Sequence, residues 1–317
     1  SGFSNETFIF SLEENDEIKN FVLRLKPTNY QVFPEYNLKL QVDIMRCLHD
    51  RGFPAPNVIL YESNEDILGS EFYLMDYING EAPSDNPPYH MDPEGMVGKA
   101  VKEDRRKIWT EWIHYLNQIH ILDIDDLGLT ELESKYRKND PIDIDIEYYQ
   151  DFLNWGMDGE DNPLCDDVLN WLRENKPKKN NPLSLCWGDS RPGNILYENF
   201  KATALLDWEM ASYGDPISDV AWCLAVDDAS SLGLTIERLE GSMDYKEALD
   251  IWSSKTGFSQ ENYEYYRIFS LLKFSVIMVR VAKKLVFNKI MPLESDFYKN
   301  NYISNFLKSE FKTKVNL

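Results

Sequence analysis

The sequence predicts an α+β protein of two lobes, in which a β-rich N-terminal lobe with one helix precedes a larger, mostly α-helical lobe. Strand-like runs dominate the first 77 residues, helical periodicity dominates after residue 104, and strand-like runs return briefly at 183–208. We place the lobe boundary near residue 79, so that residues 1–79 and 80–317 form the two predicted domains.

The composition fits a folded protein and argues against some partners. The chain has 317 residues, of which 43% are hydrophobic, enough for two lobes that each have a core. A net charge of −21 disfavours binding to nucleic acid and to anionic membranes. The four cysteines are far apart in sequence, which is typical of reduced thiols in a cytoplasmic protein, and the first residues have no signal-peptide pattern.

The N-terminal lobe is predicted from four strand-like runs and one helix. The runs cover residues 7–10, 20–26, 58–61 and 71–77. The acidic segment 13–17 suits a hairpin turn between the first two runs. Residues 36–50 have apolar side chains at helical spacing, and Gly52 and Pro54 end this helix.

The second lobe is predicted to be helical around a strand-and-loop insertion. Residues 81–97 are rich in Pro, Asp and Asn and suit a loop, whereas 104–121 has a helical apolar face. Two helices are expected within 146–175, and the chain after Ser218 is mostly helical. The apolar stretch 268–286 contains three lysines and one arginine, so it predicts a buried amphipathic helix and not a membrane span.

The insertion contains the residues that point to chemistry. Gly188 and Asp189 are followed by Asn194 on a loop with Gly and Pro, and Asp207 comes thirteen residues after Asn194. Such a loop spacing alone is a weak signal, because Asp and Asn favour turns. Phosphoryl transfer to a hydroxyl needs one carboxylate at the hydroxyl, and a carboxylate and an amide that hold Mg²⁺ against phosphates. The two aspartates and the asparagine provide these groups.

These motifs resemble those of the aminoglycoside phosphotransferase-like and choline-kinase-like small-molecule kinases. The resemblance rests on G-D-x-x-x-x-N at 188–194, on L-L-D-W-E at 205–209 and on G-D-P at 214–216, and it extends over nearly the whole chain. This variant is similar to a branch that includes kinase domains fused to some acyl-CoA dehydrogenases. The resemblance implies a protein-kinase-like fold of two lobes with ATP between them.

The resemblance also implies roles for individual residues. Asp189 would be the catalytic base or would orient the hydroxyl, and Asn194 and Asp207 would bind Mg²⁺. Arg24 would occupy the position of the strand lysine that contacts the α- and β-phosphates, and choline-kinase-like relatives also use arginine there. Lys26, two residues further on the same strand face, is the second choice for this cation.

The nucleotide would be held by the N-terminal lobe. The segment 74–78 resembles the hinge of the family, so the hinge residues Met75, Asp76 and Ile78 are expected at the adenine, with the backbone of Asp76 and Ile78 binding it. Residues 1–8 resemble the loop that covers the nucleotide, and Ser4 and Asn5 would close over the phosphates.

The sequence departs from the family pattern at two positions and at its start. Gln41 stands where a glutamate usually pairs with the strand cation, so that a hydrogen bond to Arg24 would replace the ion pair. Trp187 stands where the family commonly has histidine. The family's first strand is missing from residues 1–79, and the sequence leaves open whether the native chain extends before residue 1.

Some polar residues near the motif suit structural roles. Asp219 is expected to be a buried carboxylate that binds backbone N–H groups of the Asp189 loop, Asp215 a turn or cap residue, and His120 a structural hydrogen-bonding group. For Arg191 two interpretations stand side by side: stabilisation of the transferred phosphoryl group as a catalytic residue, or a local salt bridge.

The predicted function is transfer of the γ-phosphoryl group of ATP, with Mg²⁺, to a hydroxyl of a small molecule. A metabolite such as a hydroxyacyl-CoA is favoured over an aminoglycoside, because of the similarity to the dehydrogenase-linked branch. The alternative is a catalytically silent, pseudokinase-like module that binds nucleotide or acts as a scaffold. Gln41 and Arg24 favour the alternative, and the joint presence of Asp189, Asn194 and Asp207 favours the enzyme.

Overall fold

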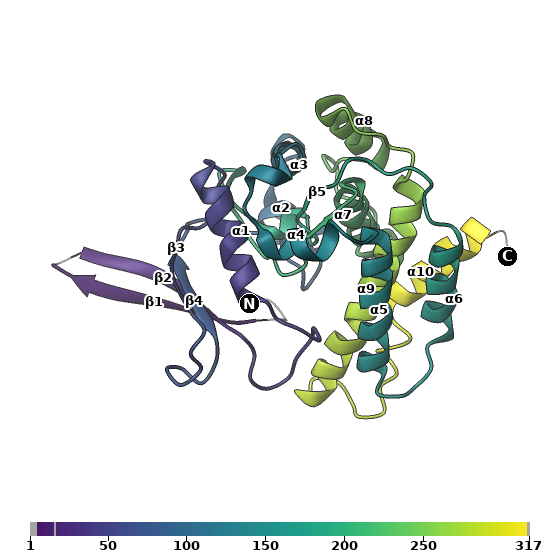
Figure 1. Cartoon of the computed structure of the whole chain (residues 1–317), viewed down its shortest axis with the longest axis horizontal. Coiled ribbons are helices and arrows are strands. Elements are labelled where there is room, and N and C mark those ends of the chain that lie inside the picture. Colours follow the sequence, from purple (N-terminus) through teal and green to yellow (C-terminus); the bar gives the residue numbers. More distant parts are fainter. Residues whose placement is uncertain (1–4, 16, 316–317) are drawn as a thin grey trace.

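The two predicted lobes are visible in the fold. The computed structural model describes residues 5–15 and 17–315. A small sheet with one helix lies at one end of the molecule, and the other helices gather at the opposite end (Figure 1). The α+β prediction is therefore confirmed.

The N-terminal sheet has four antiparallel strands in the order β1-β2-β4-β3. The strands are β1 (Glu6–Glu14), β2 (Glu17–Leu25), β3 (Val58–Glu62) and β4 (Phe72–Asp76). The first two strands are longer than predicted, because their hairpin extends beyond the sheet (Figure 1). Of the residues in β2, only 21–25 pair with β4, which leaves the outer half of β2 exposed.

Helix α1 (Leu38–Asp50) packs on β3 and β4. It begins two residues later than predicted, where the Asn37 side chain accepts a hydrogen bond from the Leu40 N–H at 2.9 Å and caps the helix. The apolar side chains Leu38, Val42 and Leu48 of its inner face are fully buried. The helical periodicity of the sequence thus identified the face that contacts the sheet.

The segment 26–37 joins β2 to α1 and also contacts the helical lobe, which the sequence did not predict. Arg280 lies between the rings of Tyr30 and Trp155, 4.3 and 4.1 Å from their centres. Its guanidinium donates two hydrogen bonds to the Gln31 carbonyl, and Phe33 packs on Phe152 of α5 (Pro141–Met157). These contacts hold the two lobes together on one side of the space between them.

Helix α9 is the central element of the larger lobe, and α5, α6, α7 and α10 pack against it. The helices are α2 (Met96–Lys99), α3 (Lys102–His120), α4 (Thr130–Tyr136), α5 (Pro141–Met157), α6 (Pro163–Glu174), α7 (Ile217–Ala229), α8 (Tyr245–Thr256), α9 (Tyr263–Phe287) and α10 (Tyr302–Val315). The predicted buried helix at 268–286 corresponds to α9. No helix in the described part of the chain is long and apolar enough to cross a membrane.

Short strand pairs form the predicted insertion. β5 (Ser184–Cys186) pairs with β8 (Ser212–Gly214), and β6 (Ile195–Glu198) pairs with β7 (Lys201–Leu205). β8 lies just beyond the region that the sequence predicted. The 81–97 segment is mostly loop, with a 3₁₀ turn at Tyr89–Met91 and the start of α2 at its end.

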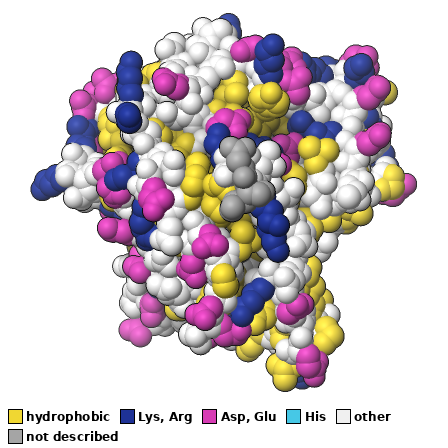
Figure 2. Space-filling view, turned by 90° about the vertical axis from the view of Figure 1, so that its right-hand side faces the viewer, with side chains coloured by type: hydrophobic (Ala, Val, Ile, Leu, Met, Phe, Trp, Pro, Cys, Tyr) yellow, Lys and Arg dark blue, Asp and Glu magenta, His cyan; other side chains and the backbone are white. Residues whose placement is uncertain are grey.

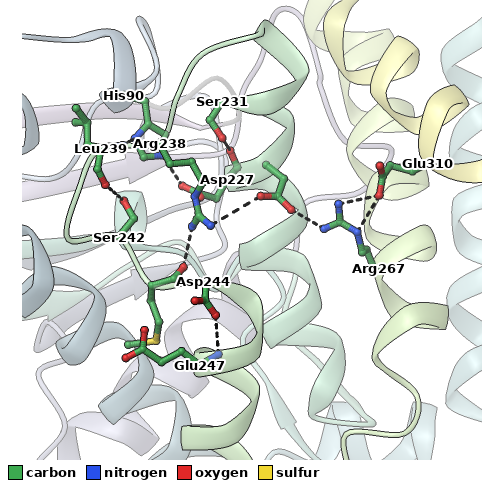
Figure 3. Close-up of polar contacts among 12 residues, drawn as sticks. His90, Asp227, Ser231, Arg238, Leu239, Ser242, Asp244, Glu247, Arg267 and Glu310 are labelled. Carbon is green, nitrogen blue, oxygen red and sulfur yellow. Dashed lines mark hydrogen bonds and ion pairs between the residues drawn. The ribbon is translucent and has the colours of Figure 1, made fainter. Parts of the chain in front are cut away.

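A chain of alternating charges ties α7, α9 and α10 together (Figure 3). Arg238 contacts Asp227 at 2.5 Å, and Arg267 bridges Asp228 at 2.7 Å and Glu310 at 2.9 Å. Each charge has an opposite neighbour, which offsets the cost of removing it from water. On the face over α6 and α10, acidic and basic side chains are mixed among hydrophobic ones, so the negative net charge forms no single-sign patch there (Figure 2).

Candidate functional site

The loop after β5 is held by Asp219 of α7. The Asp219 carboxylate accepts hydrogen bonds from the backbone N–H of Trp187 at 2.6 Å and of Gly188 at 2.9 Å. The hydroxyl of Ser190 donates to the Asp219 carbonyl at 2.8 Å. The side chain of Asp219 is buried, so the expectation of a structural carboxylate is confirmed.

Buried side chains behind the loop fix Asp219 in turn. The N–H of Trp252 donates to Nδ1 of His120 at 2.9 Å, so the ring proton of neutral His120 lies on Nε2. This nitrogen is 3.1 Å from Asp219 Oδ2 and donates to it. Asp215 accepts a hydrogen bond from the Ile217 N–H at the start of α7. Both residues thus have the structural roles expected from the sequence.

Three side chains donate to the carboxylate of Asp189. Oδ1 accepts from Arg191 Nε at 2.9 Å and from the indole N–H of Trp222 at 2.6 Å. Oδ2 accepts from Asn194 Nδ2 at 2.7 Å. Charged carboxylates are the best acceptors of such bonds, and the side chain of Asp189 remains 18% exposed. The carboxylate is therefore oriented from two sides while part of it stays accessible.

The β6–β7 hairpin brings Asn194 and Asp207 together. Ile195 pairs with Leu205 at its open end, and the Leu206 N–H donates to the Asn194 carbonyl at 2.9 Å. Asp207 follows directly. The two residues, thirteen apart in sequence, are therefore neighbours next to Asp189, to which Asn194 is bonded.

Arg24 links the N-terminal sheet to this cluster. Its Nη1 donates to Asp207 Oδ1 at 2.5 Å, across the two lobes. Burial by itself would raise the pKa of the Asp207 carboxyl, but the Arg24 guanidinium outweighs it and holds this pKa below its usual range. Asn5, at the start of β1, donates to Glu209 Oε2 at 3.0 Å. Two predicted nucleotide-binding residues thus contact the 207–209 segment.

Two buried side-chain donors of the N-terminal lobe lack acceptors within the described residues. They are Nε of Arg24 and Nε2 of Gln41. The hydrogen bond between these two side chains that the sequence allowed is absent from the described part of the structure, and Arg24 binds Asp207 instead. Lys26 follows the end of β2 and lines a hollow of about 480 Å³ with Glu35 and Glu71. Of the two candidate cations, Arg24 is the one that contacts Asp207.

The predicted hinge, residues 74–78, covers the end of β4 and the two residues after it. Met75 is buried within the strand, whereas Ile78 is half-buried beyond its end. The Asp76 N–H donates to the Asn57 carbonyl at 3.0 Å, and so it is already used within the protein. The backbone N–H of Ile78 has no partner among the residues that the structure describes. Ser4 lies outside the described residues.

Arg191 forms a local salt bridge, which is one of the two roles that the sequence suggested for it. Its guanidinium contacts the Asp85 carboxylate as well as Asp189. Burial opposes the charge of Arg191, but the two carboxylates raise its pKa well above the usual value. Arg191 therefore remains charged next to the Asp189 carboxylate.

The oxygen atoms of this cluster fit a small divalent cation. Both hydrogen bonds of Asn194 Nδ2 go to Asp189, so the amide oxygen points elsewhere. Oδ2 of Asp207 makes no hydrogen bond with a described residue. Mg²⁺ is usually held by one or two carboxylates together with substrate phosphates. Such a site does not need a cage made of protein side chains alone. In the described parts of the chain, no group of three or more His, Cys, Asp or Glu side chains is placed so that it could hold a metal ion.

Comparison with known proteins identifies the family. The sequence profile of the phosphotransferase enzyme family matches residues 1–250. The chain belongs to this family. The resemblance predicted from the motifs at 188–194 and 205–209 is thereby confirmed, and so is the prediction of a phosphotransferase enzyme class.

Sequence relatives and solved structures of similar fold agree with the assignment of this chain to the phosphotransferase family. Acyl-CoA dehydrogenase family member 11 of Rattus norvegicus is 29% identical over 225 residues, which cover 70% of the chain and 26% of that protein. The chain thus spans about a quarter of the length of this curated relative. A Ralstonia eutropha structure described as an aminoglycoside phosphotransferase matches at TM-score 0.68 and 17% identity, covering 98% and 94% of the two chains. The structure of Plasmodium vivax ethanolamine kinase matches at a TM-score of 0.61 and 14% identity, and the match covers 97% of this chain and 82% of that one.

In this phosphotransferase, Trp187 replaces the histidine that was expected from the family resemblance. Its ring stacks on Trp208 with centres 5.0 Å apart, and its indole N–H donates to the Leu206 carbonyl at 2.8 Å. Both tryptophans are fully buried. The indole therefore ties the Asp189 loop to the segment that carries Asp207, a role that a smaller imidazole cannot perform with the same stacking area.

Sequence reasoning missed two partners of the site. Trp222 lies one helical turn after Asp219 on α7, so the position of Asp219 could have suggested that Trp222 also faces the Asp189 loop. Asp85 comes from the Pro-rich loop before α2 and carries no local signal. Only the tertiary contact with Arg191 shows its place.

We expect Gly188→Ala to destabilise the Asp189 loop strongly. Gly188 has a φ of +87°, and an added Cβ would lie 2.0 Å from the Met210 carbonyl oxygen. Backbone strain and overpacking together should cost about 2–5 kcal/mol of unfolding free energy, measured by urea denaturation. Gly257→Ala is the matched control, since its φ is +76° with open space around it. Equal effects in the two variants would contradict the packing argument.

The Arg24–Asp207 pair should make stability depend on pH. Arg24→Met leaves the Asp207 charge without its partner, so we expect a loss of about 3 kcal/mol at pH 7 in urea denaturation. Because the folded-state pKa of Asp207 is lowered, the pair stabilises the fold above the ordinary carboxyl pKa, and this stabilisation disappears as pH falls through the lowered value. The difference in unfolding free energy between Arg24→Met and wild type should therefore shrink below about pH 4.

The control for this pH dependence is Lys39→Met, which removes an exposed ion pair with Asp43 in the same lobe. An exposed pair contributes at most about 1 kcal/mol, so this variant should differ little from wild type at either pH. A loss in Arg24→Met that stays constant from pH 7 to pH 3.5 would show that the ionised Asp207 is not its source.

Proposed function

We propose that this chain is an ATP- and Mg²⁺-dependent kinase that transfers the γ-phosphoryl group to a hydroxyl of a small molecule. The main support for this proposal is that Asp189, Asn194 and Asp207 lie together in the structure. Arg24 of the N-terminal lobe binds Asp207. Family membership supports the reaction class. In this proposal residues 1–79 bind the nucleotide, and residues 80–317 carry the catalytic loop and the acceptor site.

In the proposed reaction the acceptor oxygen forms a bond to the γ-phosphorus as the bond to the β-phosphate oxygen breaks and ADP leaves. Asp189 orients the hydroxyl and takes its proton. Asn194 and Asp207 would hold Mg²⁺, which supplies neutralisation of phosphate charge. Arg24 would exchange its bond to Asp207 for the α- and β-phosphates, which is supported by its unused Nε donor. Adenine would bind the backbone of Asp76 and Ile78.

The acceptor in this proposal is a metabolite, such as a hydroxyacyl-CoA, in preference to an aminoglycoside. The support comes from the sequence relatives, which are named as acyl-CoA dehydrogenase family members. Mouse family member 10 aligns over 89% of this chain.

The test is thermal stabilisation by ATP with Mg²⁺, ADP with Mg²⁺ and Mg²⁺ alone, followed by a screen of hydroxyl compounds for ADP release. We expect a nucleotide shift that needs Mg²⁺, and ADP release that needs an acceptor. No shift with nucleotide would overturn the proposal. A shift without ADP release from any acceptor would favour a catalytically silent nucleotide-binding module, which Gln41 and the Arg191–Asp189 salt bridge also fit.

A further inference from the structure

The two oxygens of the Asp189 carboxylate are occupied unequally. Each carboxylate oxygen has two lone pairs in its plane, so the group can accept about four hydrogen bonds. Oδ1 receives bonds from the Trp222 indole N–H at 2.6 Å and from Arg191 Nε at 2.9 Å. Oδ2 receives a bond from Asn194 Nδ2 at 2.7 Å. Among the described residues, the acceptor position that stays unfilled therefore lies on Oδ2.

The indole of Trp222 is a donor that is held in one place. Trp222 lies on α7 and is 3% exposed. The ring of Phe274 packs edge-on against it with centres 6.0 Å apart, and the ammonium of Lys273 lies 5.2 Å from its centre. Both neighbours belong to α9, which packs along α7. Since an indole nitrogen can only donate, the N–H of Trp222 stays directed at Asp189 Oδ1.

The other two donors to this carboxylate lie on the same loop as Asp189 and have further partners. Arg191 also binds Asp85, and Asn194 Nδ2 also donates to the Asp189 carbonyl at 2.8 Å. The terminal torsion of an aspartate side chain is broad, so a rotation could exchange the roles of its two oxygens. Trp222 fixes this rotation from outside the loop, because its own position is set by the packing of two long helices.

The titratable groups near Asp189 keep their charge over a wide pH range. Burial opposes the charge of Arg191, but the carboxylates beside it raise its pKa well above the usual value. Burial raises the pKa of the Cys223 thiol on α7 and of the Tyr149 phenol on α5 well above their usual values. Burial of Asp207 is outweighed by its guanidinium partner, which lowers its pKa. None of these four groups changes charge between about pH 4.5 and 8.

Building on the kinase function proposed above, we propose that Asp189 Oδ2 is the atom that takes the acceptor proton and that Trp222 is the positioning residue that keeps this oxygen free. The proton moves from the acceptor hydroxyl to Oδ2 while the acceptor oxygen bonds to the γ-phosphorus and ADP leaves. The proton then passes to water, which restores the carboxylate. The Trp222 N–H contacts no substrate in this step and acts through Asp189 alone.

The test removes the indole N–H and keeps an aromatic ring at position 222. Trp222→Phe lacks the donor. Replacement of Trp222 by benzothienylalanine exchanges only the N–H for sulfur, so it preserves the packing on α9 even if the phenylalanine variant fails to fold. Trp112→Phe is the matched control, because Trp112 is fully buried and its indole N–H has no acceptor among the described residues.

Mg²⁺-dependent ADP release from ATP is measured from about pH 4.5 to 9, with water and with hydroxyhexanoyl-coenzyme A as acceptors. We expect both Trp222 variants to lose kcat by on the order of 10- to 100-fold, as for a lost hydrogen bond to a charged group. KM for ATP should stay within about threefold of wild type, because the N–H contacts no substrate. The acid limb of kcat should move to higher pH, because a carboxylate that loses a donor is less favoured in its charged form.

The outcomes separate this inference from the proposed function. A kcat within about threefold of wild type in the benzothienylalanine variant overturns the inference. It is also overturned by a loss that is equal at every pH, which is the mark of a structural defect, or by the same loss in Trp112→Phe. Nucleotide binding without ADP release in wild type overturns it as well, since Asp189 then takes no proton. Absence of Mg²⁺-dependent nucleotide binding overturns the kinase proposal itself.

Discussion

Asp189→Asn is expected to abolish phosphoryl transfer while the protein still binds nucleotide. The variant keeps the shape of the side chain but loses the carboxylate that would take the hydroxyl proton, and such a group contributes about 10²- to 10⁴-fold to rate. Its amide cannot accept all three hydrogen bonds from Arg191, Trp222 and Asn194. We would measure acceptor-dependent ADP release together with ATP affinity by calorimetry.

Asp85→Asn is the control for this variant. It removes the other carboxylate partner of Arg191 and leaves the Asp189 carboxylate unchanged. We expect kcat within about tenfold of wild type, since an exposed pair contributes at most about 1 kcal/mol. Near-normal turnover in Asp189→Asn would show that the base is a different group. An equally inactive Asp85→Asn would indicate that the position of Arg191 matters more than the Asp189 charge.

Asp207→Ala is expected to remove the contribution of Mg²⁺ to nucleotide binding. Removal of a residue that only hydrogen-bonds to a metal ligand already lowers metal affinity by about 10- to 100-fold. Removal of a ligand itself should therefore lower it by at least as much. The substitution also frees Arg24 from its 2.5 Å bond. ATP affinity without Mg²⁺ should therefore be kept or slightly increased, because the freed guanidinium can bind phosphate.

The measurement is ATP affinity with Mg²⁺ and with a chelator, for wild type and variant. Each protein then serves as its own control, because a folding defect would weaken both affinities. The metal assignment is wrong if the Mg²⁺-dependent gain in affinity survives in Asp207→Ala. A parallel loss of both affinities would point to a structural role of the Arg24–Asp207 pair.

Local patterns were enough to predict the elements of the fold. The four N-terminal strands, α1 and the long buried helix near 268–286 follow from apolar periodicity, which records which face of each element is buried. Element ends were less well predicted. The β1–β2 hairpin continues through exposed residues because its strands pair with each other, and pairing is not visible in periodicity.

The motif itself also came from the sequence alone. The motifs that contain Asp189, Asn194 and Asp207 predicted a common site through their resemblance to a kinase family, whereas their spacing alone was a weak signal. Asp219 and His120 could be assigned structural roles for the same reason, since buried carboxylates near a loop bind its N–H groups.

Contacts between distant segments were decided only by the tertiary structure. Arg24 meets Asp207 across 183 positions, and Arg191 meets Asp85 across 106. That Gln41 and Arg24 make no described bond to each other was likewise visible only in the tertiary structure. One sequence determines which residue types are present and how local segments fold. Which side chains become neighbours depends on how the lobes and helices pack, because packing brings together groups whose separation along the chain carries no information about their distance in space.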